Sequence, residues 1–424
     1  MIRILKTDTF KREAMFDASA PASVTETVGA ILTDVVRRGD AALKEYTEKF
    51  DKCTLSTLQV TEEEIEEAFA TVSTEFLSTL KEAAENIRTF HEAQVREGFS
   101  LKREDGTVTG QRVLPLERVG LYVPGGTAAY PSTVLMTAIP AKVAGCTEIV
   151  MVTPPGKDGR IAPAILAAAK IAGVTSIFKV GGAQAVAALA YGTESIPAVD
   201  KIVGPGNRYV AEAKRQVFGR VSIDMIAGPS EILIVSDDKT DPKNLAADLL
   251  SQAEHDRFAS AVLVTDSEAL AKAVSEELEY QIPRLSRAEI ARESIDRFGL
   301  IVITPSLDVA LDVANEIAPE HLELCLEEPF EWLSKVKHAG SVFLGRYCPE
   351  ALGDYFAGPN HTLPTSGTAR FSSPLSVDDY VKKSQFIYYT EDALHKVYRK
   401  VALFAEQEGL TAHAKSVRSR FEEI

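Results

Sequence analysis

A chain of 424 residues, 45% hydrophobic and 25% charged, predicts a globular protein with more than one domain. The formal net charge at pH 7 is −15, which argues against nucleic acid or an anionic membrane as a partner. No apolar run is long enough to span a bilayer, and the N-terminal segment has no signal-peptide core. The four cysteines are scattered without a CxxC pair, so we expect reduced thiols in a cytoplasmic protein.

The first hundred residues are predicted to be mainly helical. Residues 1–20 are expected to form an arm, and the spacing of apolar residues over 24–35 predicts an amphipathic helix. Thr61 and Glu64 have the spacing of a capping box, so another helix is expected to begin there. His91 has no candidate partner nearby in the sequence and is predicted to be solvated.

From residue 118 onward, short β-rich runs alternate with helical segments in two series. The expected strands of the first series are Val119–Val123, Ile149–Thr153, Ser176–Val180, Lys201–Val203 and Val221–Asp224. Those of the second are Ile232–Val235, Ala261–Thr265, Leu300–Thr304, His321–Leu326 and Val342–Leu344. Strand, turn and helix in this repeating order predict parallel sheets with helices on both faces. The predicted fold class is α/β, with two Rossmann-like but incomplete parallel-sheet units, a mainly helical N-terminal arm and a small C-terminal tail.

Glycine-rich turns follow three strands of the first series, at Gly125–Gly126, Gly181–Gly182 and Gly204–Gly206. Glycine lets the backbone approach a ligand, and the N-terminus of the following helix favours an anion. These turns are expected to meet at the carboxyl ends of the strands, where such sheets bind ligands. No GxGxxG motif is present, so ordinary tight turns are the alternative interpretation. Three polar side chains at these turns, those of Tyr122, Gln184 and Asn207, are positioned so that they could contact a nucleotide.

Residues 241–255 read DPKNLAADLLSQAEH and predict a helix of the second series. Asp241 is expected to cap this helix, and Pro242 suits its first position. Gln252 and His255 are three residues apart, which places both on one face at the last turn. Taken alone, this pair fits either a solvated helix end or a fixed polar site.

Two later stretches carry further polar candidates. Glu320 and His321 are adjacent just before an expected strand, which makes them a candidate acid/base pair. An exposed loop with two polar residues is the alternative. Residues 345–375 are rich in Gly, Pro, Ser and Thr and predict a long functional loop that contains Asp354 and His361.

These patterns predict four parts of the chain. After the arm of residues 1–20, residues 21–114 and 231–375 are assigned to a first α/β domain, and residues 115–230 to a second. Residues 376–424 form a tail that is too small to bury a core of its own. This tail is therefore expected to dock on another surface.

Many of these stretches, taken together, resemble the histidinol dehydrogenase family. The matching motifs, in chain order, are GLYVPGGTAAYPS (120–132), VGGAQAVAALAYGTES (180–195), KIVGPGNRYVAEAKRQV (201–217), IDMIAGPSEILIVSD (223–237), LLSQAEHD (249–256), APEHLEL (318–324), GSVFLG (340–345), GDYFAGPNHTLPT (353–365) and LTAHAKSVRSRF (410–421). The resemblance implies NAD-dependent, four-electron oxidation of L-histidinol to L-histidine through L-histidinal, in the last steps of histidine biosynthesis. It also implies a homodimer in which the C-terminal tail completes the neighbour's site.

The resemblance further implies roles for individual residues. The implied ligands of one zinc ion per subunit are Gln252, His255, Asp354 and His413. The implied substrate contacts are Ser230, Gln252, His255, His321, Asp354, His361, Glu408 and His413, and the implied NAD contacts are Tyr122, Gln184 and Asn207. The zinc ion would hold and orient the substrate rather than generate hydroxide. His321 would take the hydroxyl proton as a base, and Glu320 would activate the water of the second oxidation.

Three alternatives remain open at this point. A thiol-dependent aldehyde dehydrogenase needs an activated cysteine, and neither Cys325, within an expected strand, nor Cys348, before a proline, has an evident activating partner. A non-catalytic zinc or nucleotide-binding protein would lack the acid/base pair, which is present here. Finally, some histidines are expected to be structural, such as His338 and His395 on predicted helix faces.

Overall fold

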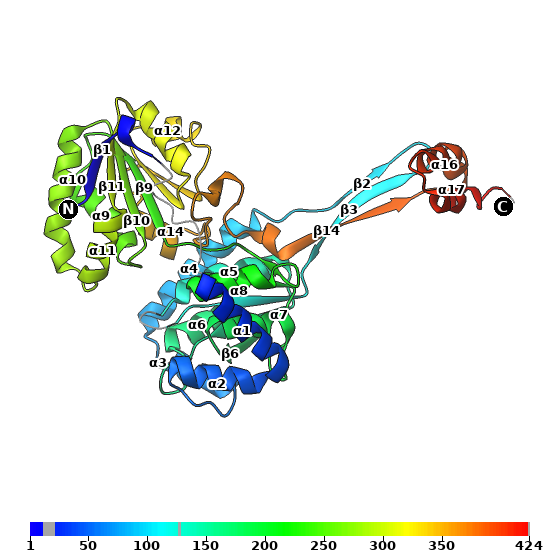
Figure 1. Ribbon diagram of the computed structural model, residues 1–424, viewed down its shortest axis with the longest axis horizontal. Coiled ribbons are helices and arrows are strands. Elements are labelled where there is room, and N and C mark those ends of the chain that lie inside the picture. The colour runs from blue at the N-terminus through cyan, green and yellow to red at the C-terminus, as the bar shows by residue number, and fades with distance from the viewer. Residues whose placement is uncertain (12–21, 126–128, 423–424) are drawn as a thin grey trace. The chain divides into compact units, whose positions relative to one another are not determined.

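The computed structural model divides into two compact units (Figure 1). It describes residues 1–11, 22–125 and 129–422. The first unit comprises Met1–Gln94 and Leu116–Tyr380, and the second comprises Val95–Pro115 and Val381–Ile424. Within the described residues, no helix is long and apolar enough to cross a membrane. Part of the expected N-terminal arm, residues 12–20, lies outside the described residues.

The first unit contains a five-stranded sheet in which all neighbouring strands are parallel. Its strands, in spatial order, are β6 (Ser176–Lys179), β5 (Glu148–Thr153), β4 (Arg118–Tyr122), β7 (Lys201–Val203) and β8 (Ser222–Ile223). The chain runs outward from β4 to β6 and then returns to place β7 beside β4. The winding of the chain across the sheet therefore reverses between β4 and β7, while the strands stay parallel, and such a reversal is the kind of position where these sheets bind ligands.

Two layers of helices cover this sheet on each face. One face carries α5 (Pro131–Ala144) and α6 (Pro163–Ala172), which α3 (Glu62–Thr71) and α4 (Thr74–Glu92) cover in turn. The other face carries α7 (Gly182–Tyr191) and α8 (Arg208–Val217), which α1 (Ala22–Arg38) covers, while α2 (Asp40–Asp51) contacts α7. The predicted capping box is confirmed at the start of α3, where Thr61 and Glu64 bond reciprocally.

The packing of α1–α4 differs from the predicted grouping of residues 21–114 with residues 231–375. These helices pack on α5–α8 of the five-stranded sheet instead. The physical reason is that α5 and α7 are apolar around their whole circumference, and nearly every residue of α7 is buried. A helix that is apolar all round must be covered on its outer side as well as against the sheet.

A six-stranded parallel sheet forms the rest of the first unit. Its strands, in spatial order, are β1 (Arg3–Lys6), β11 (Leu300–Ile303), β10 (Ser260–Thr265), β9 (Glu231–Ser236), β12 (His321–Cys325) and β13 (Ser341–Leu344). Without β1, both parallel sheets have the same winding, so the two incomplete Rossmann-like units are confirmed. All ten predicted strands are present, each within one residue of its expected bounds. The predicted arm departs from expectation, because β1 pairs with β11 as an edge strand of this sheet.

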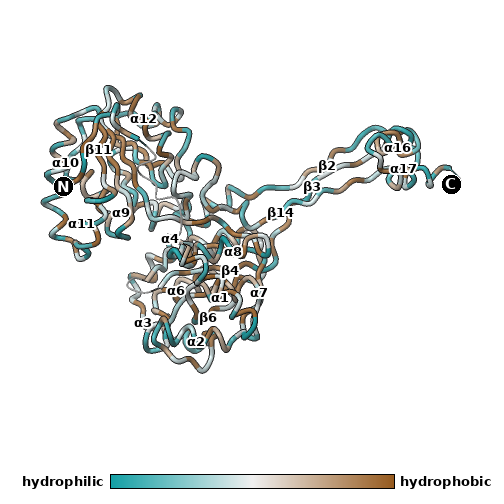
Figure 2. Tube along the Cα trace, viewed as in Figure 1, coloured by the Kyte–Doolittle hydropathy of each residue, from teal (hydrophilic) through white to brown (hydrophobic). Residues whose placement is uncertain are grey.

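Helices also cover both faces of the six-stranded sheet, and the apolar strands lie between them (Figures 1 and 2). One face carries α9 (Pro242–Ala253), α10 (Glu268–Gln281) and α11 (Ala288–Phe298), and the other carries α12 (Leu307–Ile317). Asp241 caps α9 by accepting from the Lys243 N–H, and Pro242 is the first helical residue, as predicted. The helix ends two residues before His255, whose N–H then bonds to the Gln252 carbonyl.

The second unit is an antiparallel three-stranded sheet followed by short helices. Its elements are β2 (Phe99–Lys102), β3 (Val108–Pro115), β14 (Val381–Tyr388), α15 (Glu391–His395), α16 (Tyr398–Gln407) and α17 (Thr411–Arg418). The predicted tail therefore does not stand alone, because β14 pairs along its whole length with β3. Its helical core is small and consists of Ala402, Ala405 and Ala414 with Val417 packed against them.

The predicted solvation of His91 is wrong. Its side chain is fully buried, and Nδ1 donates to the Ile87 carbonyl at 2.7 Å. Asn360 Nδ2 lies 3.3 Å from His91 Nε2 and donates to the Met136 carbonyl at 2.6 Å. The partner of His91 thus comes from a loop far along the chain, which no local pattern indicates.

Candidate active site

A buried imidazole lies at the amino end of β12. His321 is the first residue of this strand, and its Nδ1 lies 2.9 Å from the Glu231 carbonyl oxygen. A carbonyl only accepts, so Nδ1 carries a proton and Nε2 has its lone pair available in the neutral ring. Nε2 is buried and has no hydrogen-bond partner among the described residues. Burial lowers the pKa of His321, which keeps the ring neutral near pH 7.

Two carboxylates face this free nitrogen. Glu350 Oε1 is 3.7 Å and Asp354 Oδ1 is 3.9 Å from His321 Nε2. Both carboxylates belong to α14 (Glu350–Tyr355), where a spacing of four residues puts them on one face. Ligand atoms of these three residues lie within 4.8 Å of one another, as in a cation site. Burial, with the neighbouring Glu350 carboxylate, raises the pKa of Asp354 well above its usual range.

The side chains of Glu320 and His321 both form hydrogen bonds with the backbone of Glu231. Glu320 Oε2 accepts from the Glu231 N–H at 2.9 Å, while the Glu231 carbonyl accepts from His321. The first residue of β9 therefore holds both members of the candidate acid/base pair. Burial, and then the Glu231 carboxylate, raise the pKa of Glu320 well above its usual range. Ser230 directly precedes Glu231, so it lies at the amino end of β9 beside Glu320 and His321.

Like His321, Gln252 has buried polar side-chain atoms that lack a hydrogen-bond partner among the described residues. Its side chain is 1% exposed, and neither the amide oxygen nor the amide nitrogen has a hydrogen-bond partner in the part of the chain that the structure describes. A buried amide without partners is costly, so it points to a missing ligand. The adjacent Ser251 donates to Glu350 Oε2 at 3.1 Å, which connects the end of α9 to α14.

His255 and His361 adjoin this cluster. His361 Nδ1 donates to the Asp354 carbonyl at 3.1 Å, and burial lowers the pKa of His361 to about 4. His255, just after α9, is close enough for its charge to contribute to the lowered pKa of His321, after the larger effect of burial. The remaining predicted site residues, Glu408 and His413, are exposed on the second unit.

Glu350 belongs to this cluster, although the sequence patterns did not predict it. It follows Pro349 and precedes Asp354 by four residues, so a helical reading of this short segment would have placed both carboxylates on one face. The expectation of an irregular loop over residues 345–375 hid this signal. Glu231 was also missed, because it bonds to both members of the pair through its backbone N–H and carbonyl, which a side-chain pattern does not reveal.

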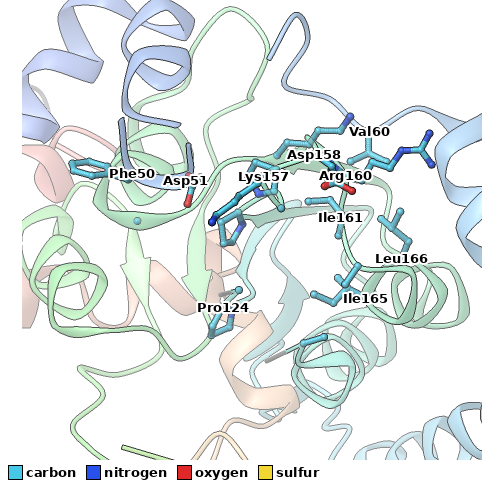
Figure 3. A pocket seen from close by; sticks show the side chains of 18 of the residues that line it. Phe50, Asp51, Val60, Pro124, Lys157, Asp158, Arg160, Ile161, Ile165 and Leu166 are labelled. Carbon is cyan, nitrogen blue, oxygen red and sulfur yellow. Dashed lines mark hydrogen bonds between the residues drawn. The ribbon is translucent and has the colours of Figure 1, made fainter. Parts of the chain in front are cut away.

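A cavity of about 1510 Å³ lies at the carboxyl ends of the strands of the five-stranded sheet (Figure 3). Tyr122, Gln184 and Asn207, the three predicted nucleotide contacts, all line it. The Tyr122 hydroxyl accepts from the Gly182 N–H at 3.0 Å. Gly204 has a φ of +116°, and an added Cβ would lie 2.1 Å from the Tyr122 carbonyl oxygen, so only glycine fits there. Gly126 lies outside the described residues.

The cysteines do not fit a thiol mechanism. Cys325 is buried in β12, and burial together with Glu323 raises the pKa of its thiol. A nucleophilic cysteine needs the opposite shift, toward the thiolate. Thiol catalysis by Cys325 therefore has no support in its surroundings.

A cavity at the point where one parallel sheet reverses its winding, together with a buried imidazole among carboxylates, is typical of an α/β enzyme. The family model described as histidinol dehydrogenase matches residues 16–421. The chain therefore belongs to the histidinol dehydrogenase family, whose members are oxidoreductases of histidine biosynthesis.

Individual relatives agree with this assignment. The histidinol dehydrogenase of Clostridium acetobutylicum is 55% identical over 427 residues, which cover 99% of each chain. That of Bacillus cereus strain ATCC 14579 is 58% identical over 404 residues, or 94% of each chain. The crystal structure of histidinol dehydrogenase from Elizabethkingia anophelis matches with a TM-score of 0.93 at 37% identity and covers 99% of this chain and 98% of that one.

Proposed function

We propose that this chain oxidises L-histidinol to L-histidine through L-histidinal, with one NAD reduced in each of two steps. In the first step the alcohol loses a hydride and a proton to give the aldehyde. In the second the aldehyde gains water, and the resulting hydrate again loses a hydride and a proton to give the acid. The observation that carries this proposal is the free, buried Nε2 of His321 at 3.7 and 3.9 Å from two carboxylates. Family membership supplies the substrate.

His321 is proposed as the base for the hydroxyl proton. The Glu231 carbonyl holds the proton on Nδ1, so Nε2 is the atom that accepts. Burial keeps this nitrogen unprotonated near pH 7, which a base requires. Glu320 is proposed to activate the water for the second oxidation, because it lies beside His321, with its Oε2 3.6 Å from Nδ1.

The residues present fit a zinc ion. The buried Gln252 amide without partners would join His255 and Asp354, with His413 supplied by a partner subunit, to hold one ion per subunit. When bound, zinc would supply positive charge that orients the amine and imidazole nitrogens of the substrate. The proposed substrate contacts are Ser230, Gln252, His255, His321, Asp354, His361, Glu408 and His413.

NAD is proposed to bind in the cavity of the five-stranded sheet. Tyr122, Gln184 and Asn207 line this cavity from the segments after β4, β6 and β7. These segments lie around the point of reversal between β4 and β7, where doubly wound sheets bind dinucleotides. NAD would accept the hydride in each step.

The variant His255→Asn tests the zinc proposal and the activity together. We expect it to lose tightly bound zinc and NADH formation from histidinol, because one of the proposed ligands is removed. His338→Asn is the control, since His338 is not among the proposed ligands and its backbone N–H bonds to Asn315 Oδ1 at 3.2 Å. Metal analysis and NADH absorbance on the same preparations check both expectations. Wild-type zinc content in His255→Asn would disprove the ligand assignment, and zinc without turnover in the wild type would favour a binding protein.

A further inference from the structure

Acidic side chains line the cavity of the five-stranded sheet, and all but one have a protein partner. Glu64 accepts from the Thr61 N–H in the capping box and pairs with a lysine. Glu67 pairs with an arginine at 3.7 Å, and Asp158 accepts from an N–H within its own turn at 3.1 Å. Asp51 has no hydrogen bond or ion pair to any described residue, and its Oδ2 is buried.

Asp51 reaches the cavity from outside the sheet. It is the last residue of α2, and the chain after it runs beside β6, where the Lys179 N–H bonds to the Leu58 carbonyl at 2.7 Å. A Cβ added to Gly159 would lie 3.4 Å from Cys53 Sγ, so the chain just after Asp51 also lies against the loop between β5 and α6. Asp51 thereby lines the cavity on the side of β6 and of the loop that follows β5, and Figure 3 shows its side chain there.

That position has a defined role in sheets with this winding. The dinucleotide phosphates lie where the winding reverses, and the adenosine half extends over the strand that follows the first βα unit. An acidic residue near the end of this second strand usually accepts hydrogen bonds from the ribose hydroxyls. Here the second strand is β5, and the chain after it reads Pro154, Pro155, Gly156, without an acid at that point.

We propose that Asp51 accepts hydrogen bonds from the vicinal hydroxyls of the adenosine ribose and thereby selects NAD over NADP. The inference rests on the proposed placement of NAD in this cavity. A carboxylate has two oxygens for two hydroxyl donors, and it repels the dianionic 2′-phosphate of NADP. The buried oxygen that lacks a protein partner would gain one on binding.

The charges around Asp51 are consistent with this selection. Lys179 is paired with Glu64, and Arg160 lies 3.7 Å from Glu67, so both cations have acidic partners. Lys157 also lines the cavity but is exposed, so solvent screens its charge. Burial raises the pKa of Asp51 to about 6, which leaves the carboxylate ionised in neutral solution.

Calorimetric titration of the zinc-loaded protein without histidinol tests the inference directly, with NAD, NADP and 2′-deoxy-NAD as ligands. We expect Asp51→Asn to weaken NAD binding by about 10-fold to 100-fold, the range for losing hydrogen bonds to a charged group. Its preference for NAD over NADP should fall by at least about 10-fold, because the repulsion of the 2′-phosphate is removed. 2′-Deoxy-NAD should bind weakly to the wild type, and Asp51→Asn should bind it little worse, because the same contact is already absent.

Two matched variants make the result decisive. Asp158→Asn keeps an oxygen that can accept within its turn, and it should bind NAD like the wild type. Gln184→Ala probes the cavity itself. If Gln184→Ala weakens NAD binding while Asp51→Asn changes neither the affinity nor the preference for NAD, the role of Asp51 is refuted and the NAD site stands. If neither variant weakens binding, NAD binds elsewhere and both proposals fail.

Discussion

We expect single substitutions to separate the two half-reactions, because Glu320 and His321 are proposed to act in different steps. Glu320→Gln keeps the size of the side chain and its ability to accept from the Glu231 N–H. We expect this variant to retain NAD-dependent hydride exchange with histidinol but to form histidine about 10² to 10⁴ times more slowly, the range for losing a general base.

Following isotope exchange and histidine formation separately checks this prediction. His321→Asn serves as the comparison, since it should slow the alcohol oxidation as well. A Glu320→Gln enzyme that converts histidinal to histidine at the wild-type rate would show that another group activates the water.

Asp51 also has a consequence for stability. Burial raises its pKa from the usual 3.8 to about 6, so the folded protein binds this proton more tightly than the unfolded chain does. Below about pH 4, where Asp51 is protonated in both states, the free energy of unfolding carries no cost from this residue. The free energy of unfolding then falls as pH rises from about 4 to about 6, and the loss is complete above that range. The shift corresponds to at most ~3 kcal/mol, and solvent screening at this partly buried carboxylate reduces the cost to about 1 kcal/mol.

We therefore expect Asp51→Asn to raise the free energy of unfolding of the NAD-free protein by about 1 kcal/mol near pH 7.5, and by much less near pH 4. Urea unfolding at several pH values measures this gain. A gain that is the same at all pH values would not come from the titration of Asp51.

At the scale of elements, a buried ion pair shapes the loop after β7. Lys214 of α8 pairs with Asp224, and both side chains are 1% exposed. The pair also holds the backbone of Gly204, whose N–H donates to Asp224 Oδ2 at 2.7 Å and whose carbonyl accepts from Lys214 Nζ at 2.9 Å. One ion pair thus connects α8, the glycine loop and the chain after β8.

Replacing Lys214 with Met should lower the free energy of unfolding by about 3–5 kcal/mol, because Asp224 would be left as an unpaired buried charge. The double variant Lys214→Met/Asp224→Asn should recover part of this loss, since it removes that charge. Chemical denaturation of the three proteins measures the difference. A single variant as stable as the wild type would show that Asp224 has another partner or access to water.

At the scale of the whole molecule, the second unit exposes more apolar surface than its small core explains. The large apolar side chains that are more than half exposed there are Val95, Phe99, Leu101, Ile387, Tyr388, Leu403 and Phe404. Exposed apolar surface of this kind is typical of interaction sites. It supports the proposed homodimer, in which Glu408 and His413 complete the site of the neighbouring subunit.

Mixing two inactive variants tests this arrangement. His413→Ala and His321→Asn subunits should each form inactive dimers. Unfolding and refolding equal amounts together should restore roughly a quarter of wild-type activity, because half the dimers are mixed and each has one intact site. If both residues served the same subunit's site, the mixture would stay inactive. A monomer in light scattering at working concentration would also rule out the proposal.

Local sequence determined the regular elements of this protein. Runs of β-branched residues between glycine turns specify the ten predicted strands, and Thr61 with Glu64 and Asp241 with Pro242 specify two helix starts. These signals are local because they depend on backbone preferences and on hydrogen bonds between residues a few positions apart. The motifs of the candidate site were likewise readable as adjacent polar residues, such as Glu320 and His321.

Tertiary structure alone decided which of these elements meet. Helices α1–α4 cover the five-stranded sheet, β1 joins the six-stranded sheet, and β14 pairs with β3. Glu350 faces His321, and Asp51 lines the cavity of the five-stranded sheet, across long separations in the chain. The apolar face of a helix or the free edge of a strand must be covered, but its own sequence does not specify which element covers it. That choice depends on the packing of the whole core, because complementary shapes come from residues distant in sequence.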